Sequence, residues 1–219
     1  MQKKYGLLLD FDGVVVDSEP LYEKVMKLQF DRISVIIDEA DWLYFKGKDM
    51  DASLKHIQEN YYPSLDIEKV KKQFHIDLYK EFKLNMNYIP GFLNFFYSCV
   101  NDEFKDLLVT STARDVMEWT FDNVPVDNIF SGMITASEVE NTKPHPEPYL
   151  KGAKHIGIPI ENCIVIEDSV NGIRAGKAAG AKVIGITTTF PRELIHEADF
   201  IVDSYAELSP EILKELLNT

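Results

Sequence analysis

Short apolar runs that alternate with stretches of helical spacing constrain the fold of this chain more than any other feature. The runs lie at residues 5–11, 106–111, 131–137, 163–168 and 181–187, with a weaker one at 198–204. They are nearly continuous in apolar residues, which is typical of strands covered on both faces of a parallel sheet. The helical stretches lie at 114–123, 146–157 and 170–180. The sequence therefore predicts an α/β fold with a doubly wound, mostly parallel sheet.

The segment between the first two runs has a different character. Residues 17–86 are rich in charged and aromatic side chains, and their apolar spacing is helical. Pro90 and Gly91 mark a break where the chain returns to the sheet. We therefore expect residues 1–16 and 87–219 to form an α/β core domain, and residues 17–86 to form an inserted helical cap domain.

Composition and charge exclude several classes of partner. The 219 residues are 45% hydrophobic, enough for one good core, and carry a formal net charge of -13. Such a charge argues against nucleic acid and anionic membranes, and an anionic substrate would need local positive charge from a metal ion or lysines. The two cysteines sit in apolar surroundings, which fits a reducing compartment, and no stretch is long enough to span a bilayer. We expect a cytoplasmic monomer.

Two carboxylates follow the first apolar run, in the stretch "LLLDFDG" that ends at Gly13. Asp10 and Asp12 stand where the strand should end, and Gly13 allows a sharp turn after them. Ligands of open parallel sheets bind beyond this end of the strands. The two acids could hold Mg²⁺, or one could act as a nucleophile and the other as a proton carrier. The plain alternative is that they cap a loop.

A second acidic pair, Glu167 and Asp168, ends the run "CIVIED". Because it should occupy the same edge of the sheet, the two pairs together predict a metal site more strongly than either pair does alone. The expected metal is Mg²⁺, which prefers oxygen ligands.

Hydroxyl groups and a lysine complete the candidate site. Thr110, Ser111 and Thr112 lie at a strand end before a helix, where they could bind an anionic oxygen or cap the helix. Lys143 precedes Pro144, which favours an extended backbone there. A lysine near four acids would neutralise a phosphate, although a lysine in a polar loop is by default a surface residue.

In order and spacing, these segments resemble the four motifs of the haloacid dehalogenase superfamily of phosphotransferases. The four matching segments are "DFDGVVVDSEP", "VTST", "KPHPEPY" and "IEDSVNGIRAGKAAG". The resemblance covers essentially the whole chain. The inserted helical segment has the position typical of the branch that contains β-phosphoglucomutase and phosphoglycolate phosphatase.

The resemblance implies roles for the two acidic pairs. Asp10 would attack phosphorus and form an aspartyl-phosphate, and Asp12 would protonate the leaving group and then activate water. Mg²⁺ would be held by Asp10, Asp168 and the backbone carbonyl of Asp12. Glu167 would be either a further ligand or a residue that supports the ligands.

The resemblance also implies a phosphate-binding set. Ser111 would bind the phosphoryl oxygens, with Thr110 as the alternative because the second motif can be aligned either way. Lys143 would bridge the nucleophile and the phosphate. In the inserted segment, Lys46 and Lys48 lie in a stretch similar to the substrate-specificity loop of this branch, and could bind an anion.

The predicted function is that of a Mg²⁺-dependent phosphatase acting on a small phosphorylated metabolite. The nearest alternative is a β-phosphoglucomutase-type enzyme, in which an arginine holds the second phosphate; Met50 stands at that position here. A haloacid dehalogenase needs neither Mg²⁺ nor the second acid of the first pair. A receiver domain lacks an inserted cap, and a non-catalytic binding protein would be expected to have lost a motif residue, whereas none is missing.

Overall fold

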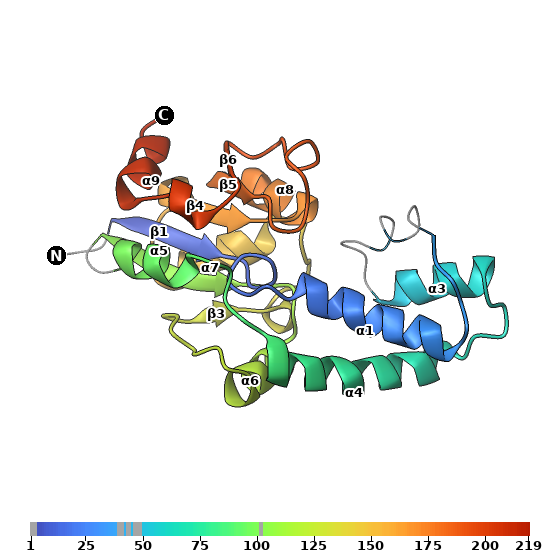
Figure 1. Ribbon diagram of the computed structural model, residues 1–219. Helices are drawn as coiled ribbons and strands as arrows, with labels where there is room; N and C mark the ends of the chain where they lie inside the picture. The colour runs from blue at the N-terminus through green and yellow to red at the C-terminus, as the bar shows by residue number, and fades with distance from the viewer. Residues whose placement is uncertain (1–3, 39–41, 43–44, 46–49, 101–102) are drawn as a thin grey trace. The chain divides into compact units, whose positions relative to one another are not determined.

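The computed structural model describes the chain except for residues 1–3, 39–41, 43–44, 46–49 and 101–102 (Figure 1). The chain forms two compact units, Met1–Asp17 with Asn87–Thr219, and Ser18–Met86. Asp17 falls in the first unit, one residue beyond the boundary expected from the sequence. Its N–H donates to the carbonyl of Asn87 (3.0 Å), which ties the two crossing segments together on the first unit's side.

The first unit is built on a six-stranded parallel sheet with the order β3-β2-β1-β4-β5-β6 (Figure 1). The strands are β1 (Tyr5–Leu9), β2 (Phe104–Val109), β3 (Met133–Ile134), β4 (Cys163–Glu167), β5 (Lys182–Ile186) and β6 (Phe200–Val202). This confirms the predicted fold class. The run at 131–137 was expected to be a longer strand, but it pairs over two residues only, because its second half turns into a 3₁₀ segment at Ala136–Glu138.

The central strand β1 is covered on both faces. Leu7, Leu8 and Leu9 are fully buried, and β1 pairs with β2 on one side and β4 on the other. Strand order reverses between β1 and β4, so their carboxyl ends flank the topological switch point, where open α/β sheets bind their ligands.

The α-helices described in this unit are α5 (Phe92–Cys99), α6 (Arg114–Asn123), α7 (Glu147–Ile156), α8 (Val170–Ala179) and α9 (Pro210–Leu217). Helices α6, α7 and α8 lie at the three predicted places, whereas α5 before β2 and α9 after β6 were not predicted. Helices α7 and α8 end at Gly157 (φ 69°) and Gly180 (φ 90°), which adopt the left-handed conformation that commonly terminates helices. Both helices pack on the face of the sheet that carries Leu8, Val109 and Val165.

The second unit is helical where it is described. It contains α1 (Glu19–Arg32), α3 (Met50–Asn60) and α4 (Ile67–Asn85). Helices α1 and α4 contact each other, and Tyr22 of α1 lies against Phe74 and Phe82 of α4. Lys46 and Lys48 lie outside the described residues, and Met50 begins α3.

In the described part of the chain, no helix combines the length and apolarity that crossing a bilayer requires.

Gly172 provides a test of the packing between α8 and β4. A Cβ atom at this position would lie 1.8 Å from the carboxyl carbon of Glu167. Helix propensity alone would make Gly172→Ala stabilising by up to about 1 kcal/mol. We expect the opposite sign, a loss of about 1–3 kcal/mol in the free energy of unfolding by urea, because Glu167 must be displaced. Exposed Asn171→Ala on the same turn is the control. A variant at Gly172 that is more stable than the wild type would contradict this packing.

Asp77 provides a second test, within the helical unit. This buried side chain accepts hydrogen bonds from Arg32, Gln29 and Gln73, which lower its pKa to about 2. Asp77→Asn should lower the free energy of unfolding by about 1–3 kcal/mol at neutral pH. Because the folded pKa is depressed, this contribution is complete above the unfolded pKa of about 4 and is lost as pH falls toward 2. Thermal unfolding across pH measures it, with exposed Asp31→Asn as the control. A pH-independent difference would exclude the ionic origin.

Candidate active site

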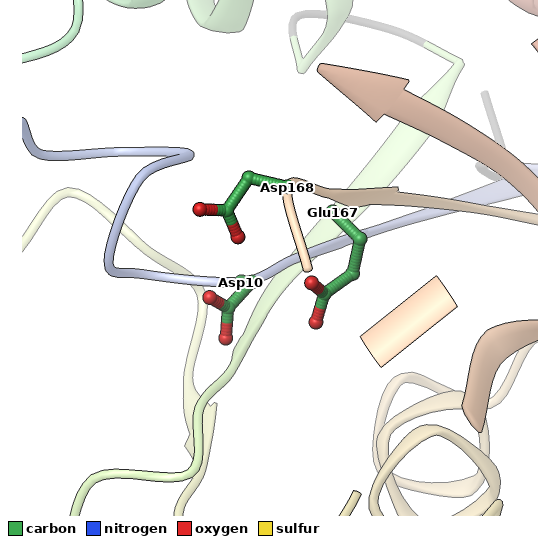
Figure 2. A group of neighbouring side chains, drawn as sticks. All are labelled: Asp10, Glu167 and Asp168. Atoms are coloured by element: carbon green, nitrogen blue, oxygen red, sulfur yellow. The ribbon is translucent and has the colours of Figure 1, made fainter. Parts of the chain in front are cut away.

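The predicted acids meet at the carboxyl ends of β1 and β4. Leu9 pairs with Ile166, so Asp10 follows β1 beside the end of β4, and its N–H donates to the carbonyl of Ile166 (3.2 Å). Carboxylate oxygens of Asp10, Glu167 and Asp168 lie within 4.8 Å of one another. Figure 2 shows these three side chains gathered at one edge of the sheet.

A tight turn after Asp10 shapes the site. Gly13 has φ 71°, and its N–H donates to the carbonyl of Val16 (2.8 Å). A Cβ atom at Gly13 would lie 1.9 Å from Oδ2 of Asp168. Glycine is therefore required both by the backbone conformation and by the approach of Asp168. On the same turn, Oδ2 of Asp12 accepts a hydrogen bond from the hydroxyl of Thr112 (3.3 Å).

Lys143 reaches the same cluster from the loop before α7. Its Nζ donates to Oδ1 of Asp10 (2.6 Å), to Oε1 of Glu167 (2.7 Å) and to the carbonyl of Val109 (2.9 Å). Only 5% of its side chain is exposed. Lys143 is therefore not a solvated surface lysine. Burial alone would lower its pKa, but the charges of Asp10 and Glu167 outweigh burial and raise it, so the amine stays protonated.

Glu167 is fully buried and hydrogen-bonded on both carboxylate oxygens. Oε1 accepts from Lys143 and from the hydroxyl of Tyr149 (2.7 Å). Oε2 accepts from the hydroxyl of Ser169 (2.9 Å) and from its backbone N–H (3.2 Å). Ser169 also caps α8, since its hydroxyl accepts the N–H of Gly172 (3.0 Å).

In Asp10 and Asp168, the other two carboxyl groups of the cluster, the charged form is disfavoured. Desolvation, which outweighs the attraction of Lys143, and the charge of Glu167 together raise the pKa of Asp10 to about 7. Burial first, and then the charges of Glu167 and Asp10, raise the pKa of Asp168 well above its usual range. One ammonium group is thus set against three carboxylates, of which Glu167 and Asp168 are buried and Asp10 is partly buried.

This donor set fits a hard divalent cation. The available atoms are carboxylate oxygens, which Mg²⁺ prefers, and the unfavourable charge of Asp10 and Asp168 is the kind that a cation among them would relieve. Asp10 and Asp168 are the side chains that would hold it, at the edge of the sheet where Asp12 begins the turn.

Of the three hydroxyl groups in the second motif, the two candidates for binding phosphate, on Thr110 and Ser111, lie in different settings. Thr110 is buried, and its Oγ1 accepts the N–H of Thr112 (3.0 Å). Ser111 is exposed at the end of β2. Neither caps α6, whose N-cap position is Ala113 without a side-chain hydrogen bond. The alternative that these hydroxyls cap that helix is therefore wrong.

Sequence reasoning missed the residues that support the acids. Tyr149 and Ser169 bind Glu167, and the hydroxyl of Thr189 bonds Asp168. Thr188 holds the turn by donating to the carbonyl of Gly13. Tyr149 and Ser169 lie within the third and fourth motif segments, and this location could have marked them as candidates. Nothing in the sequence marked the threonines after β5.

Comparison with known proteins finds relatives that align with about half of this chain and relatives that align with nearly all of it. Glycerol-1-phosphate phosphohydrolase 1 of Saccharomyces cerevisiae is 40% identical over 110 residues, 46% of this chain and 44% of that protein. Hexitol phosphatase A of Escherichia coli is 25% identical, covering 93% of both chains. The chain spans less than half the length of the yeast relative, and 19% of a longer chloroplast protein of Arabidopsis thaliana.

Solved structures and a family model agree with this fold. The structure of β-phosphoglucomutase from Clostridium difficile superposes with a TM-score of 0.76 at 24% identity, over 98% of this chain and 97% of that one. The family model described as haloacid dehalogenase-like hydrolase matches residues 7–186, a range that includes all four acids and the lysine of the site. The chain belongs to the haloacid dehalogenase-like hydrolase family.

Proposed function

We propose that this protein is a Mg²⁺-dependent phosphatase that hydrolyses a small phosphorylated metabolite through an aspartyl-phosphate on Asp10. The observation that carries the proposal is the contact of Lys143 with Asp10 (2.6 Å) inside a cluster of three carboxylates, two of which are buried. A lysine so placed fixes the nucleophile and offers positive charge where a phosphate must approach. The names of the yeast and E. coli relatives, a phosphohydrolase and a phosphatase, support the same chemistry.

In the first step, a carboxylate oxygen of Asp10 attacks phosphorus, and the bond from phosphorus to the ester oxygen breaks. Asp12 donates its proton to the departing alcohol. Ser111, which is exposed at the end of β2, binds a phosphoryl oxygen, and we favour it over Thr110 because the hydroxyl of Thr110 is buried and already holds Thr112. Lys143 stabilises negative charge on the transferring group, and a Mg²⁺ ion held by Asp10 and Asp168 would supply further positive charge there.

In the second step, Asp12 accepts a proton from water, which attacks the phosphorus of the aspartyl-phosphate. The bond from phosphorus to Asp10 breaks, and inorganic phosphate leaves. Asp12 therefore serves as the acid in one step and the base in the other. Its place on the turn that follows Asp10, hydrogen-bonded to Thr112, is consistent with a group held near the nucleophile.

A sugar phosphomutase is the second candidate, because a solved β-phosphoglucomutase shares the fold. A mutase must hold the idle phosphate of a bisphosphate away from the nucleophile, and arginine does this well because its planar fork matches phosphate oxygens. Met50, at the corresponding position, has no charge and no donor. Lys46 and Lys48 lie outside the described residues and remain candidates for anion binding. The balance favours hydrolysis.

Removal of the nucleophile tests the covalent mechanism. Asp10→Asn should lower phosphate release from an active ester by about a thousandfold or more. EDTA should stop turnover of the wild type, and added Mg²⁺ should restore it. Exposed Asp122→Asn is the matched control and should retain wild-type activity. Circular dichroism checks the fold of each variant. Substantial turnover by Asp10→Asn would exclude an aspartyl-phosphate on this residue.

The choice between phosphatase and mutase is tested by the fate of the phosphoryl group. A panel of phosphoglycolate, glycerol phosphate, hexitol phosphates and β-glucose 1-phosphate is assayed for free phosphate, and the last also for glucose 6-phosphate. We expect phosphate release with little isomerisation, because loss of a charge-assisted contact to the second phosphate weakens bisphosphate binding by about ten- to a hundredfold. Efficient isomerisation with negligible phosphate release would favour the mutase.

A further inference from the structure

The hydrogen bonds of Glu167 distinguish it from the other two acids. An ionised carboxylate has about four lone-pair sites for hydrogen bonds or metal coordination. Four protein donors reach Glu167, two on each oxygen: Lys143 and Tyr149 on Oε1, and the hydroxyl and N–H of Ser169 on Oε2. Figure 2 shows the side chains of Glu167 and Asp168 leaving the backbone in different directions. The acceptor capacity of Glu167 is therefore already used by the protein.

Strand alternation explains the separate direction of Glu167. Successive residues of a strand face opposite sides of the sheet, so Glu167 shares a face with Cys163 and Val165. That face carries α7 and α8, and Tyr149 of α7 belongs to the same buried cluster. Glu167 is 0% exposed, and the close approach of Gly172 leaves it no room to turn toward α8.

Tyr149 contacts both partners of the central ion pair. Its hydroxyl donates to Oε1 of Glu167 (2.7 Å), and Nζ of Lys143 lies 5.1 Å from the centre of its ring. Its side chain is fully buried. The nitrogen of Lys143 is thus confined by Glu167, by the aromatic ring and by the carbonyl of Val109, with Asp10 as its remaining partner.

We propose that Tyr149 is a positioning residue, whose hydroxyl, together with Ser169, fixes Glu167 as the anchor of Lys143 and keeps Glu167 out of the metal's ligand set. The metal would then be held by the Asp10 and Asp168 side chains. The inference rests on the proposed phosphatase function and deepens it, because it assigns different roles to two neighbouring acids. Glu167 positions the ammonium group of Lys143 beside the nucleophile Asp10, and Asp168 binds the metal.

Tyr149→Phe removes one hydroxyl and keeps the ring. Oε1 of Glu167 then has a vacant acceptor site, so the carboxylate and the lysine that it anchors are free to shift relative to Asp10. We expect kcat to fall about ten- to a hundredfold, the size of effect found for groups that orient metal and catalytic ligands. KM should stay within about twofold, because no substrate contact is lost. Calorimetric Mg²⁺ affinity without substrate should also stay within about twofold, because no ligand is lost.

Tyr205→Phe is the matched control. Tyr205 is also buried, and its hydroxyl donates a single hydrogen bond, to the carbonyl of Val14 (2.9 Å). Its removal should cost similar thermal stability and leave kcat within about twofold of the wild type. If kcat of Tyr149→Phe equals that of the wild type or falls only as much as that of Tyr205→Phe, the positioning role is overturned.

The ligand assignment has its own measurement, independent of turnover. Calorimetry of Mg²⁺ binding compares Glu167→Gln with Asp168→Asn, since each variant removes one negative charge from the cluster. We expect Asp168→Asn to weaken binding at least tenfold more than Glu167→Gln does. Equal losses, or a tenfold change in Mg²⁺ affinity for Tyr149→Phe, would show that Glu167 ligates the metal and would overturn the inference. A wild type that binds Mg²⁺ but releases no phosphate from any ester would instead overturn the proposed function.

Discussion

The ion pair of buried Lys143 with Asp10 and Glu167 is the interaction on which the site depends. A buried ammonium group is costly unless it is paired, and this one is 5% exposed with three acceptors within 2.9 Å. It ties together three distant parts of the chain: the end of β1, the end of β4 and the loop before α7. The sheet brings the two acids together, and the lysine offsets part of their repulsion. Burial first, and then the negative charge that Lys143 leaves uncompensated, raise the pKa values of Asp10 and Asp168, which makes the site suited to a divalent cation.

The end of β4 places two adjacent acids in different surroundings. Glu167 is the last residue of β4 and points with Val165 into the layer between sheet and helices. Asp168 is the next residue and approaches the glycine turn after β1, where a Cβ at Gly13 would collide with it. Two neighbours in sequence therefore meet different surroundings. Gly172 approaches Glu167 closely, and Gly13 approaches Asp168 closely, so each carboxylate has little freedom to move. Glycine at these two positions therefore helps to fix the geometry of the site.

The conflict between an acidic chain and an anionic substrate is resolved locally. The net charge of -13 disfavours the approach of a phosphate ester to most of the surface. Within the described residues of the site, Lys143 brings a positive charge to Asp10, and the proposed metal would bring two more. The proposed phosphoryl transfer takes place at this edge of the sheet, so we expect the choice of substrate to come from other parts of the chain.

The sequence alone predicted the fold class and the alternation of strands and helices, because continuous apolar runs are a local pattern with direct physical meaning. It also identified candidate residues of the site: Asp10, Lys143, Glu167 and Asp168. It left open whether Lys143 is a surface lysine, whether the hydroxyls after β2 cap α6, and whether Glu167 and Asp168 share the same surroundings. Those questions depend on what packs against each side chain. Tertiary structure decided them: β-pairing placed the two acidic pairs side by side, α7 covered Glu167 with Tyr149, and the turn at Gly13 met Asp168. Contacts between residues more than a hundred positions apart, such as Lys143 with Asp10, form only when the sheet assembles, and sequence spacing does not encode them.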